Sequence, residues 1–458
     1  MNYELSIMNY KFLITNYELR ITNFKVKTIF RNLLIILCFF CFNNVFSQSV
    51  DSLIKEALVN NPYLKSLDLK VRASEERAKS INSYPAPTVG FELSQVPFNT
   101  LNWLNEPISQ NITFSQMFHL GGKIGAMTDA EKVNIKISRD NIDVYKVNLT
   151  GNIKMIFFNI WMLERKIEVQ QEGIVLLNQL LTSLTNLFEI NKSAPADIFT
   201  IKSEIAFNET QLLILSNQKE AEIFKMNKLL GRDLNSPELS VSKALPNIHI
   251  EYKQEELENI LAGNNPSLKK MNTMAEMNKF EIIANNKDKI PDLMLQAMVM
   301  RMPQGMLMTA KSGSSMGKWD GSSDYGYSLM ASITLPFAPW TKEKYEAKEQ
   351  ELLANIQSIE AEKNDMQREM NVMLKTALLK LKTSRELIIL YSGKVIPLYE
   401  QARSSQISQY QNNQTSINMI IDANRMLLMQ SMNYYMAQAD EQMAIAEIEM
   451  MVGRVVNK

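Results

Sequence analysis

The side chains best suited to chemistry in this sequence are thioethers. The chain has 29 Met in 458 residues, and one short stretch carries Met298, Met300, Met302, Met306, Met308 and Met316. Thioether sulfur is a soft ligand that suits Cu(I) and Ag(I). Methionine is also a flexible apolar filler. The stretch therefore predicts a metal-related cluster, with ordinary packing as the alternative.

Residues for other kinds of chemistry are scarce. The only histidines are His119 and His249, and both cysteines, Cys38 and Cys41, fall in a segment that we expect to be removed. The mature chain then has no thiolate ligand, disulfide or cysteine nucleophile. The 49 basic and 49 acidic residues balance, which gives no reason for a nucleic-acid partner. We expect neither an enzyme nor a cofactor.

Residues 1–47 resemble a spurious N-terminal extension followed by a secretory signal peptide. Basic residues at 25, 27 and 31 precede an apolar run over 33–42 and a cleavage-like pattern over 45–47. The apolar run is too short for a permanent membrane helix, and no other run approaches the length of one. We therefore expect export of an unlipidated protein.

Alternation with a period of two predicts strands near 292–302 and 325–337. In the second strand, Tyr325, Tyr327, Leu329, Ala331, Ile333 and Leu335 alternate with small or polar residues. Similar patterns predict strands near 88–94 and 111–120. About ten residues suffice to cross a bilayer when tilted, and apolar-out, polar-in alternation is typical of a membrane barrel. A soluble hairpin packed on a helix is the alternative.

Long helices should make up most of the chain, because it has only 15 Gly and 14 Pro to form turns. We expect helices over 122–190, 195–230, 342–409 and 416–452. The longest of them would reach about 100 Å. Leu352, Ile356, Ile359 and later apolar residues in the third helix have the spacing of a coiled-coil seam.

The sequence repeats itself once. Asn264, Asn265 and Pro266 repeat the Asn-Asn-Pro of residues 60–62, and residues 451–454 echo the end of the helix at 229–232. We therefore expect two modules, residues 48–232 and 253–458, joined by a connector at 233–252. The fold class is mainly α with a small β part. Because open strand edges cannot face lipid, four membrane strands would have to close into a barrel with those of other copies.

The duplicated Asn-Asn-Pro helix starts, the paired strands and the two hairpin tips resemble the outer-membrane efflux proteins, the TolC family, over essentially the whole mature chain. The tips carry Phe188, Asn191, Ser193, Pro195 and Asp197, then Tyr410, Asn413, Thr415, Ser416 and Asn418. The resemblance implies a homotrimer whose twelve-stranded outer-membrane barrel continues into a periplasmic α-helical coiled-coil tunnel. It also implies a passive conduit that docks onto a periplasmic adaptor (membrane fusion protein) and an inner-membrane RND pump.

The resemblance also assigns roles at the tips. Adaptor contacts are expected at Asn191, Ser193, Pro195, Asn413, Thr415 and Ser416. Family members usually have Gly where this chain has Asn191 and Asn413, but Asn tolerates the left-handed conformation better than most residues. Asp197 and Asp422 could ring the tunnel entrance as a gate that prefers cations. The alternatives are a helix N-cap for Asp197 and a solvated face for Asp422.

The methionines favour the heavy-metal branch of the family, the CusC and CzcC type, with Cu(I) or Ag(I) as cargo. Drugs or other small molecules are the alternative cargo. A periplasmic coiled-coil adaptor or scaffold would share the signal and the heptads. Such a protein needs no aromatic strands, so Tyr325 and Tyr327 argue against it.

Overall fold

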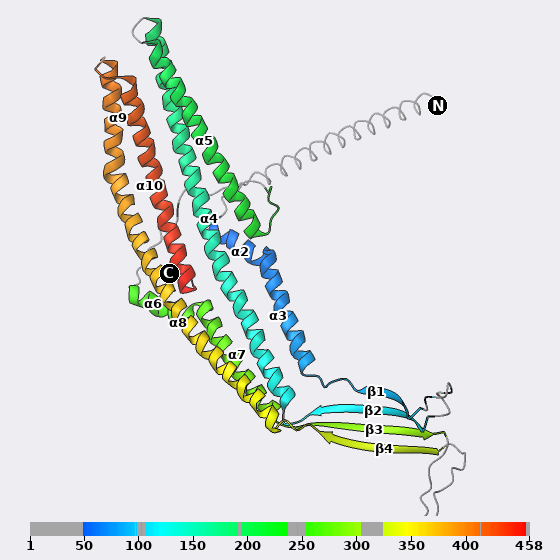
Figure 1. Cartoon of the computed structure of the whole chain (residues 1–458). Helices are drawn as coiled ribbons and strands as arrows, with labels where there is room; N and C mark the ends of the chain where they lie inside the picture. Colours follow the sequence, from blue (N-terminus) through cyan, green and yellow to red (C-terminus); the bar gives the residue numbers. More distant parts are fainter. Residues whose placement is uncertain are drawn as a thin grey trace, which may run out of the picture.

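The computed structural model describes residues 49–96, 98, 102, 107–190, 194–236, 245, 253–303, 324–412 and 414–454. In these residues the chain is mostly helical and elongated, with one small sheet at one end (Figure 1), as expected for the mainly α class. The helices are α2 (Val50–Asn60), α3 (Pro62–Ile81), α4 (Lys123–Glu189), α5 (Pro195–Leu230), α6 (Gln254–Asn264), α7 (Pro266–Asp288), α8 (Pro339–Leu390), α9 (Ile396–Gln411) and α10 (Ile417–Val452). The strands are β1 (Thr88–Ser94), β2 (Ser109–His119), β3 (Asp292–Met302) and β4 (Asp324–Ile333).

Helix ends follow proline and glycine. The helices α3, α5, α7 and α8 all begin at a proline, whose missing N–H is not needed in the first turn. Gly231 and Gly453 end α5 and α10 in the left-handed conformation. Between such residues α4 runs for 67 residues, about 100 Å at the usual rise. Among the described residues, no helix combines the length and apolarity that a membrane crossing needs.

The helix expected over 342–409 is not continuous. It starts earlier, at Pro339, and a π-helical turn at Tyr391–Val395 separates α8 from α9. The N–H of Ile396 donates to the carbonyl of Tyr391, five residues back. Pro397 follows at once and has no N–H to donate, so the regular hydrogen-bond ladder cannot pass through it. The proline was the available signal for this break.

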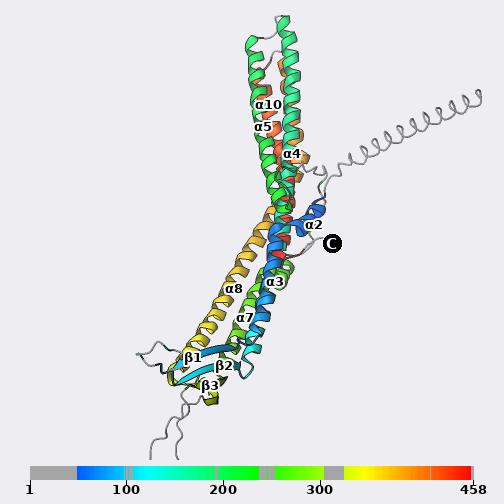
Figure 2. The same ribbon diagram turned by 90° about the vertical axis from the view of Figure 1, so that its right-hand side faces the viewer.

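The helices form two consecutive groups along the long axis. Away from the sheet, α5, α4, α10 and α9 pack in that order, and near the sheet α3, α4, α7 and α8 do so (Figures 1 and 2). Both helical hairpins, α4–α5 and α9–α10, point their closed ends away from the sheet (Figure 1). Buried Leu53, Ile153 and Leu230 join α2, α4 and α5 in one core cluster, and a second cluster joins α6, α7, α8 and α10. The helices thus form one continuous rod.

The helical segment that starts at Val50 is broken at Asn61, because the residue before a proline disfavours helical geometry. Asn61 accepts hydrogen bonds from the first N–H groups of α3 and donates to the carbonyl of Leu229 at 2.8 Å. Asn265 caps α7 in the same way and donates to the carbonyl of Met451, also at 2.8 Å. The two joints are therefore built alike.

The four strands form one antiparallel sheet in the order β1-β2-β3-β4. Two strand boundaries differ from expectation. β2 begins two residues earlier, at Ser109, and β4 ends at Ile333 rather than near 337. Pro336 follows shortly and cannot donate to a ladder. In the described residues β1 and β4 are the two edges of the sheet.

Candidate functional site

The sheet has two chemically different faces. Residues directly opposite each other on neighbouring strands share a face, so the register collects the exposed apolar side chains on one side: Val89, Phe91, Ile112, Phe114, Leu295, Val299, Tyr325, Tyr327, Leu329 and Ile333. Tyr327 is 81% exposed. The other face carries Thr88, Ser94, Asn111, Thr113, Ser115, Gln296, Ser328 and Ser332. The apolar face is therefore uncovered in a single chain.

Methionines occupy the polar face as well. Met298, Met300 and Met302 of β3 point to this face, together with Met294, which pairs directly with Met117 of β2. Met330 of β4 lies on the same face. The other predicted cluster members, Met306, Met308 and Met316, lie outside the described residues. Met117, Met294 and Met330 were not among the predicted ligands, although their alternation with apolar residues marks their face in the sequence.

The hairpin tips are only partly described, since Asn191, Ser193 and Asn413 lie outside the described residues. Pro195 is the first residue of α5 and Ser416 the N-cap position of α10. Thr415 donates through its hydroxyl to Gln406 at 3.1 Å. Asp197 lies in the first turn of α5 rather than at its N-cap, which is Ala194.

The two predicted gate carboxylates differ in their surroundings. The Tyr410 hydroxyl of α9 donates to Asp197 Oδ2 at 2.9 Å, and this bond ties the second hairpin to the first. Asp422 lies on α10 with 63% of its side chain exposed, and its Oδ1 is 3.8 Å from Nη1 of Arg425. Asp197 is thus held in a contact between helices, whereas Asp422 is open to solvent.

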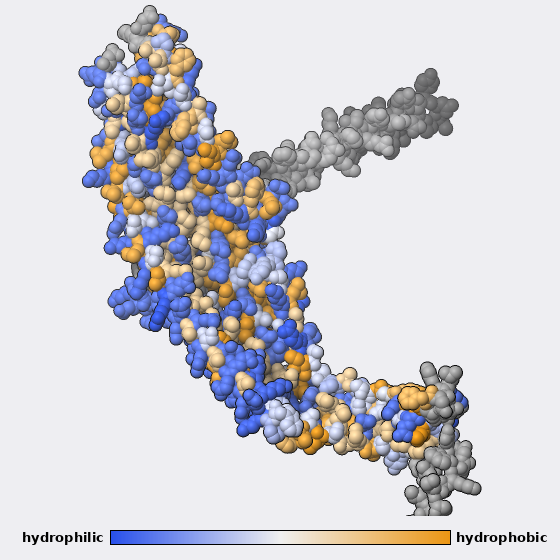
Figure 3. All heavy atoms as spheres, in the orientation of Figure 1, coloured by the Kyte–Doolittle hydropathy of each residue, from blue (hydrophilic) through white to orange (hydrophobic). Residues whose placement is uncertain are grey.

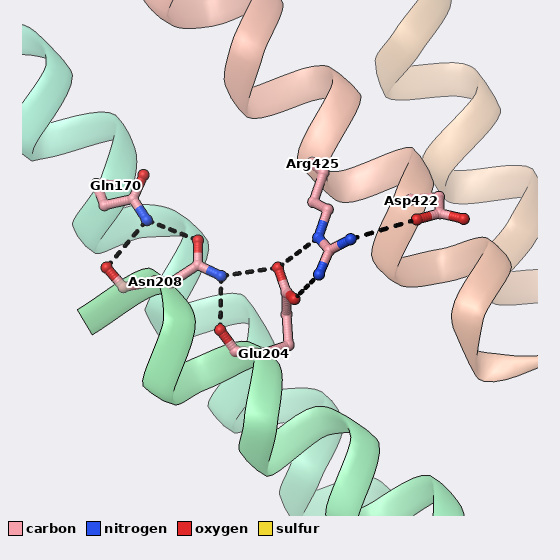
Figure 4. Close-up of polar contacts among 5 residues, drawn as sticks. All are labelled: Gln170, Glu204, Asn208, Asp422 and Arg425. Atoms are coloured by element: carbon pink, nitrogen blue, oxygen red, sulfur yellow. Dashed lines mark hydrogen bonds and ion pairs between the residues drawn. The ribbon is translucent and has the colours of Figure 1, made fainter. Parts of the chain in front are cut away.

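A polar network crosses three helices below the tips (Figure 4). Arg425 of α10 donates to both carboxylate oxygens of Glu204 on α5, with the Nε to Oε1 distance at 2.9 Å. The Asn208 amide donates to the same Oε1 at 2.9 Å, and Gln170 of α4 donates to Asn208 Oδ1 at 2.6 Å. Gln170, Glu204 and Asn208 are each about 4% exposed.

Such a network joins α4, α5 and α10 in one relative register, because every buried member depends on the next for its hydrogen bonds. Arg425 also lies 5.7 Å from the ring of Phe207. The bonds to Glu204 raise the pKa of the Arg425 guanidinium above its ordinary value, so it stays charged. No sequence motif marks this network, because its members lie far apart, between residues 170 and 425, and share no regular spacing.

A charged cluster fixes the junction between sheet and helices. Lys123, at the start of α4, is 2.8 Å from Asp292 Oδ1 at the start of β3, and His119 Nδ1 is 3.0 Å from the same oxygen. Gly121 and Gly122 between them have positive φ values of 67° and 77°. His119 therefore lies at the junction, and in the described residues no group of three or more His, Cys, Asp or Glu could hold a metal ion.

The helical rod also leaves apolar side chains uncovered, as orange patches in Figure 3 illustrate. On α8 these include Val372, Leu379 and Ile389, with exposures of 64%, 66% and 72%. Val372 and Leu379 are seven residues apart and lie on nearly the same side of α8, and the exposed Lys382–Glu386 ion pair follows them on that side. Uncovered apolar side chains on one helix offer an interaction surface.

No protein-family model matches the chain, and no curated protein matches it. Solved structures do match. The outer-membrane channel OprN is similar with 14% identity and a TM-score of 0.68, covering 88% of this chain and 89% of its own. CusC, whose structures concern its folding and transmembrane channel formation, is similar with 15% identity and a TM-score of 0.67. The match covers 90% of this chain and 96% of CusC. The CmeC outer membrane channel of Campylobacter jejuni is similar with 13% identity and a TM-score of 0.68, and the match covers 88% of this chain and 85% of CmeC. At these identities the likeness establishes the fold.

Proposed function

We propose that this protein is the outer-membrane exit duct of a tripartite efflux pump, a passive conduit across the outer membrane and the periplasm. The observation that carries the proposal is the two-faced sheet at the end of a helical rod, whose longest helix, α4, has 67 residues and reaches about 100 Å. One face of the sheet is apolar and exposed, and the other is polar. The shared fold with channels such as OprN and CmeC supports the same function.

The sheet argues for a trimer. Its apolar face fits lipid, but in a bilayer the free edges of β1 and β4 would leave backbone groups without hydrogen bonds. Two copies give eight strands, and the interior of such a small barrel is filled by side chains. Three copies give twelve strands, which leaves room for a lumen lined by the polar face. The uncovered side chains of Val372, Leu379 and Ile389 on α8 offer apolar surface for contact between neighbouring copies.

In this assembly the rods form a tunnel that extends into the periplasm. Its far end would meet a periplasmic adaptor and an inner-membrane RND pump, and the tip residues Pro195, Thr415 and Ser416, together with Asn191, Ser193 and Asn413, would provide adaptor contacts. The protein needs no cofactor and performs no catalysis in this role. The two modules, residues 48–232 and 253–458, each supply one strand pair and one helical hairpin.

Asp422 and Asp197 would contribute differently to a gate at the tunnel entrance. Three copies of exposed Asp422 would place a ring of carboxylates near the opening, which favours cations. Asp197 would instead hold the opening narrow through its bond to Tyr410. Asp422→Asn should therefore lower the cation-over-anion permeability ratio in planar bilayers, and Tyr410→Phe should raise the open probability.

The proposed cargo is a heavy-metal cation such as Cu(I) or Ag(I), supported by the methionines of the polar sheet face. A multidrug or small-molecule cargo is the second candidate. The helical rod is common to the channels that share the fold, so the rod itself does not favour one cargo over another. A periplasmic scaffold is disfavoured, since it has no use for the exposed Tyr325 and Tyr327.

The test is fractionation of cells that express the protein, followed by electrophoresis of outer-membrane detergent extracts with and without heating. The duct predicts an outer-membrane oligomer of three chains that dissociates on heating. Growth of a deletion strain on copper and silver, compared with growth on drugs, then decides between the cargoes. A monomer in the soluble periplasmic fraction would overturn the duct.

A further inference from the structure

We propose that Met300 and Met302 of β3 form a two-thioether binding site for a soft monovalent cation, Cu(I) or Ag(I). The site lies on the polar face of the sheet, above Gly326 of β4. Its position in a lumen rests on the proposed duct function, whereas the binding chemistry depends only on the two side chains. Of the methionines in the stretch that begins at Met298, only this pair is assigned to the site.

The geometry of Gly326 brings the two side chains together. Gly326 pairs directly with Met300 across β3 and β4. A Cβ atom at Gly326 would lie 3.2 Å from Cγ and 3.4 Å from Sδ of Met300, and 3.8 Å from the Cε methyl of Met302. Both methionines therefore reach over the space that the missing side chain leaves. Two residues separated by one on a strand normally lie about 7 Å apart, and here they converge above one point.

Packing does not account for thioethers at these positions. The apolar groups of the sheet lie on the opposite face, where Val299 and Tyr327 pair. On the polar face Met300 lies between Asn111 of β2 and Gly326 of β4, and Met302 pairs with Asp324. The adaptability of methionine is useful in an irregular core, but this face is the polar side of a single open sheet.

Further thioethers continue along the same face. Met298 lies two residues from Met300, and Met294 pairs directly with Met117. Successive positions on one face of a strand are about 7 Å apart. A cation bound at Met300 and Met302 would thus have further soft ligands one short step away, which suits transit better than storage.

Silver titration of the purified full-length protein tests the site. The protein carries [13C]methyl-labelled methionine in detergent, silver nitrate is added in chloride-free buffer, and the methyl spectra are followed. Met300→Leu/Met302→Leu keeps the size of both side chains and removes both sulfurs. Gly326→Ala keeps both sulfurs but displaces Met300. The matched control, Met127→Leu/Met373→Leu, removes two thioethers that are 44% and 49% exposed on α4 and α8.

The proposal predicts that the two resonances shifted at the lowest silver concentration are those absent from Met300→Leu/Met302→Leu. Gly326→Ala should need at least about tenfold more silver for the same shift, and the control should behave like the parent. If the first resonances to shift persist in the double variant, or if Gly326→Ala titrates like the parent, the site is wrong. Oligomer formation in outer-membrane extracts is scored separately. An intact trimer without this binding refutes the site alone, and binding by a protein that forms no outer-membrane oligomer refutes the duct alone.

Discussion

Arg425 on α10 binds the buried carboxylate of Glu204 on α5 with two guanidinium nitrogens, across 221 residues of sequence (Figure 4). The side chain of Glu204 is 3% exposed, whereas that of Arg425 is 52% exposed. The pair therefore joins a buried acid to a base that still contacts solvent. It is one direct link between the two helical hairpins below their tips.

We predict that Arg425→Met lowers the free energy of unfolding by roughly 1–2 kcal/mol, because Glu204 is left buried with only the Asn208 amide as a partner. Because Arg425 is half exposed, the loss of stability should be smaller than for a fully buried pair. Denaturant unfolding in detergent measures this change in the free energy of unfolding. Arg72→Met, on the exposed face of α3, is the control. Adding Glu204→Gln should recover part of the loss, and a double variant whose losses simply add would show that the two residues are not coupled.

A second prediction compares the glycines that end the two modules. Both Gly231 and Gly453 have positive φ, so alanine at either costs about 1–2 kcal/mol in backbone strain. A Cβ at Gly231 would also lie 2.5 Å from the backbone oxygen of Asn60, but one at Gly453 stays 3.0 Å or more from its neighbours. Gly231→Ala should therefore lower the melting temperature more than Gly453→Ala. The reverse order would contradict this account of the joints.

The third prediction uses two adjacent residues of β4. Tyr327 lies on the apolar face and Ser328 on the polar face. A lysine on a lipid-facing position near the bilayer midplane costs about 2–4 kcal/mol, while lumen positions tolerate charge. Tyr327→Lys should thus reduce the amount of heat-modifiable oligomer in outer membranes, and Ser328→Lys should leave it near the parental level. Equal effects of the two would indicate that neither face meets lipid.

The fourth prediction concerns Asp440 of α10. Burial raises the pKa of this carboxyl, Glu447 adds to the shift, and Lys380, 3.8 Å away, and Lys166 oppose it. Because the folded pKa is higher than the unfolded one, stability is lost as pH rises through the interval between them. The Asp440→Asn protein should therefore have the same melting temperature as the parent at strongly acidic pH. At neutral pH its melting temperature should be higher than that of the parent.

Melting curves across that pH range check the sign. Asp68→Asn, which removes an exposed carboxylate from α3, controls for the change in net charge. Lys380 keeps Glu447 as a partner at 3.4 Å in the Asp440→Asn protein. Lys166, whose pKa is already lowered by burial, loses the attraction of Asp440. A lower melting temperature of Asp440→Asn at neutral pH would contradict the prediction.

Much of the fold was predictable because its signals are local. Helix starts at proline and ends at glycine depend on backbone geometry within a few residues, so α5 runs from Pro195 to Leu230 as expected. The bounds of α4 and β3 also lie within a residue of the expected positions. The two faces of the sheet follow from the period of two alone. Pro397 was equally local, yet it was overlooked, and the helix that contains it proved to have a π-helical turn.

The sequence by itself thus determined the kinds of element, most of their bounds and which side of each strand is apolar. The tertiary structure decided which distant residues meet. Asp197 accepts a hydrogen bond from Tyr410, Glu204 binds Arg425, and Met300 and Met302 converge above Gly326. Periodicity cannot specify these partners, because it reports only how one segment presents its own faces. A contact between segments depends on the packing angle and register of whole helices and strands, and these are set by every side chain at the interface together.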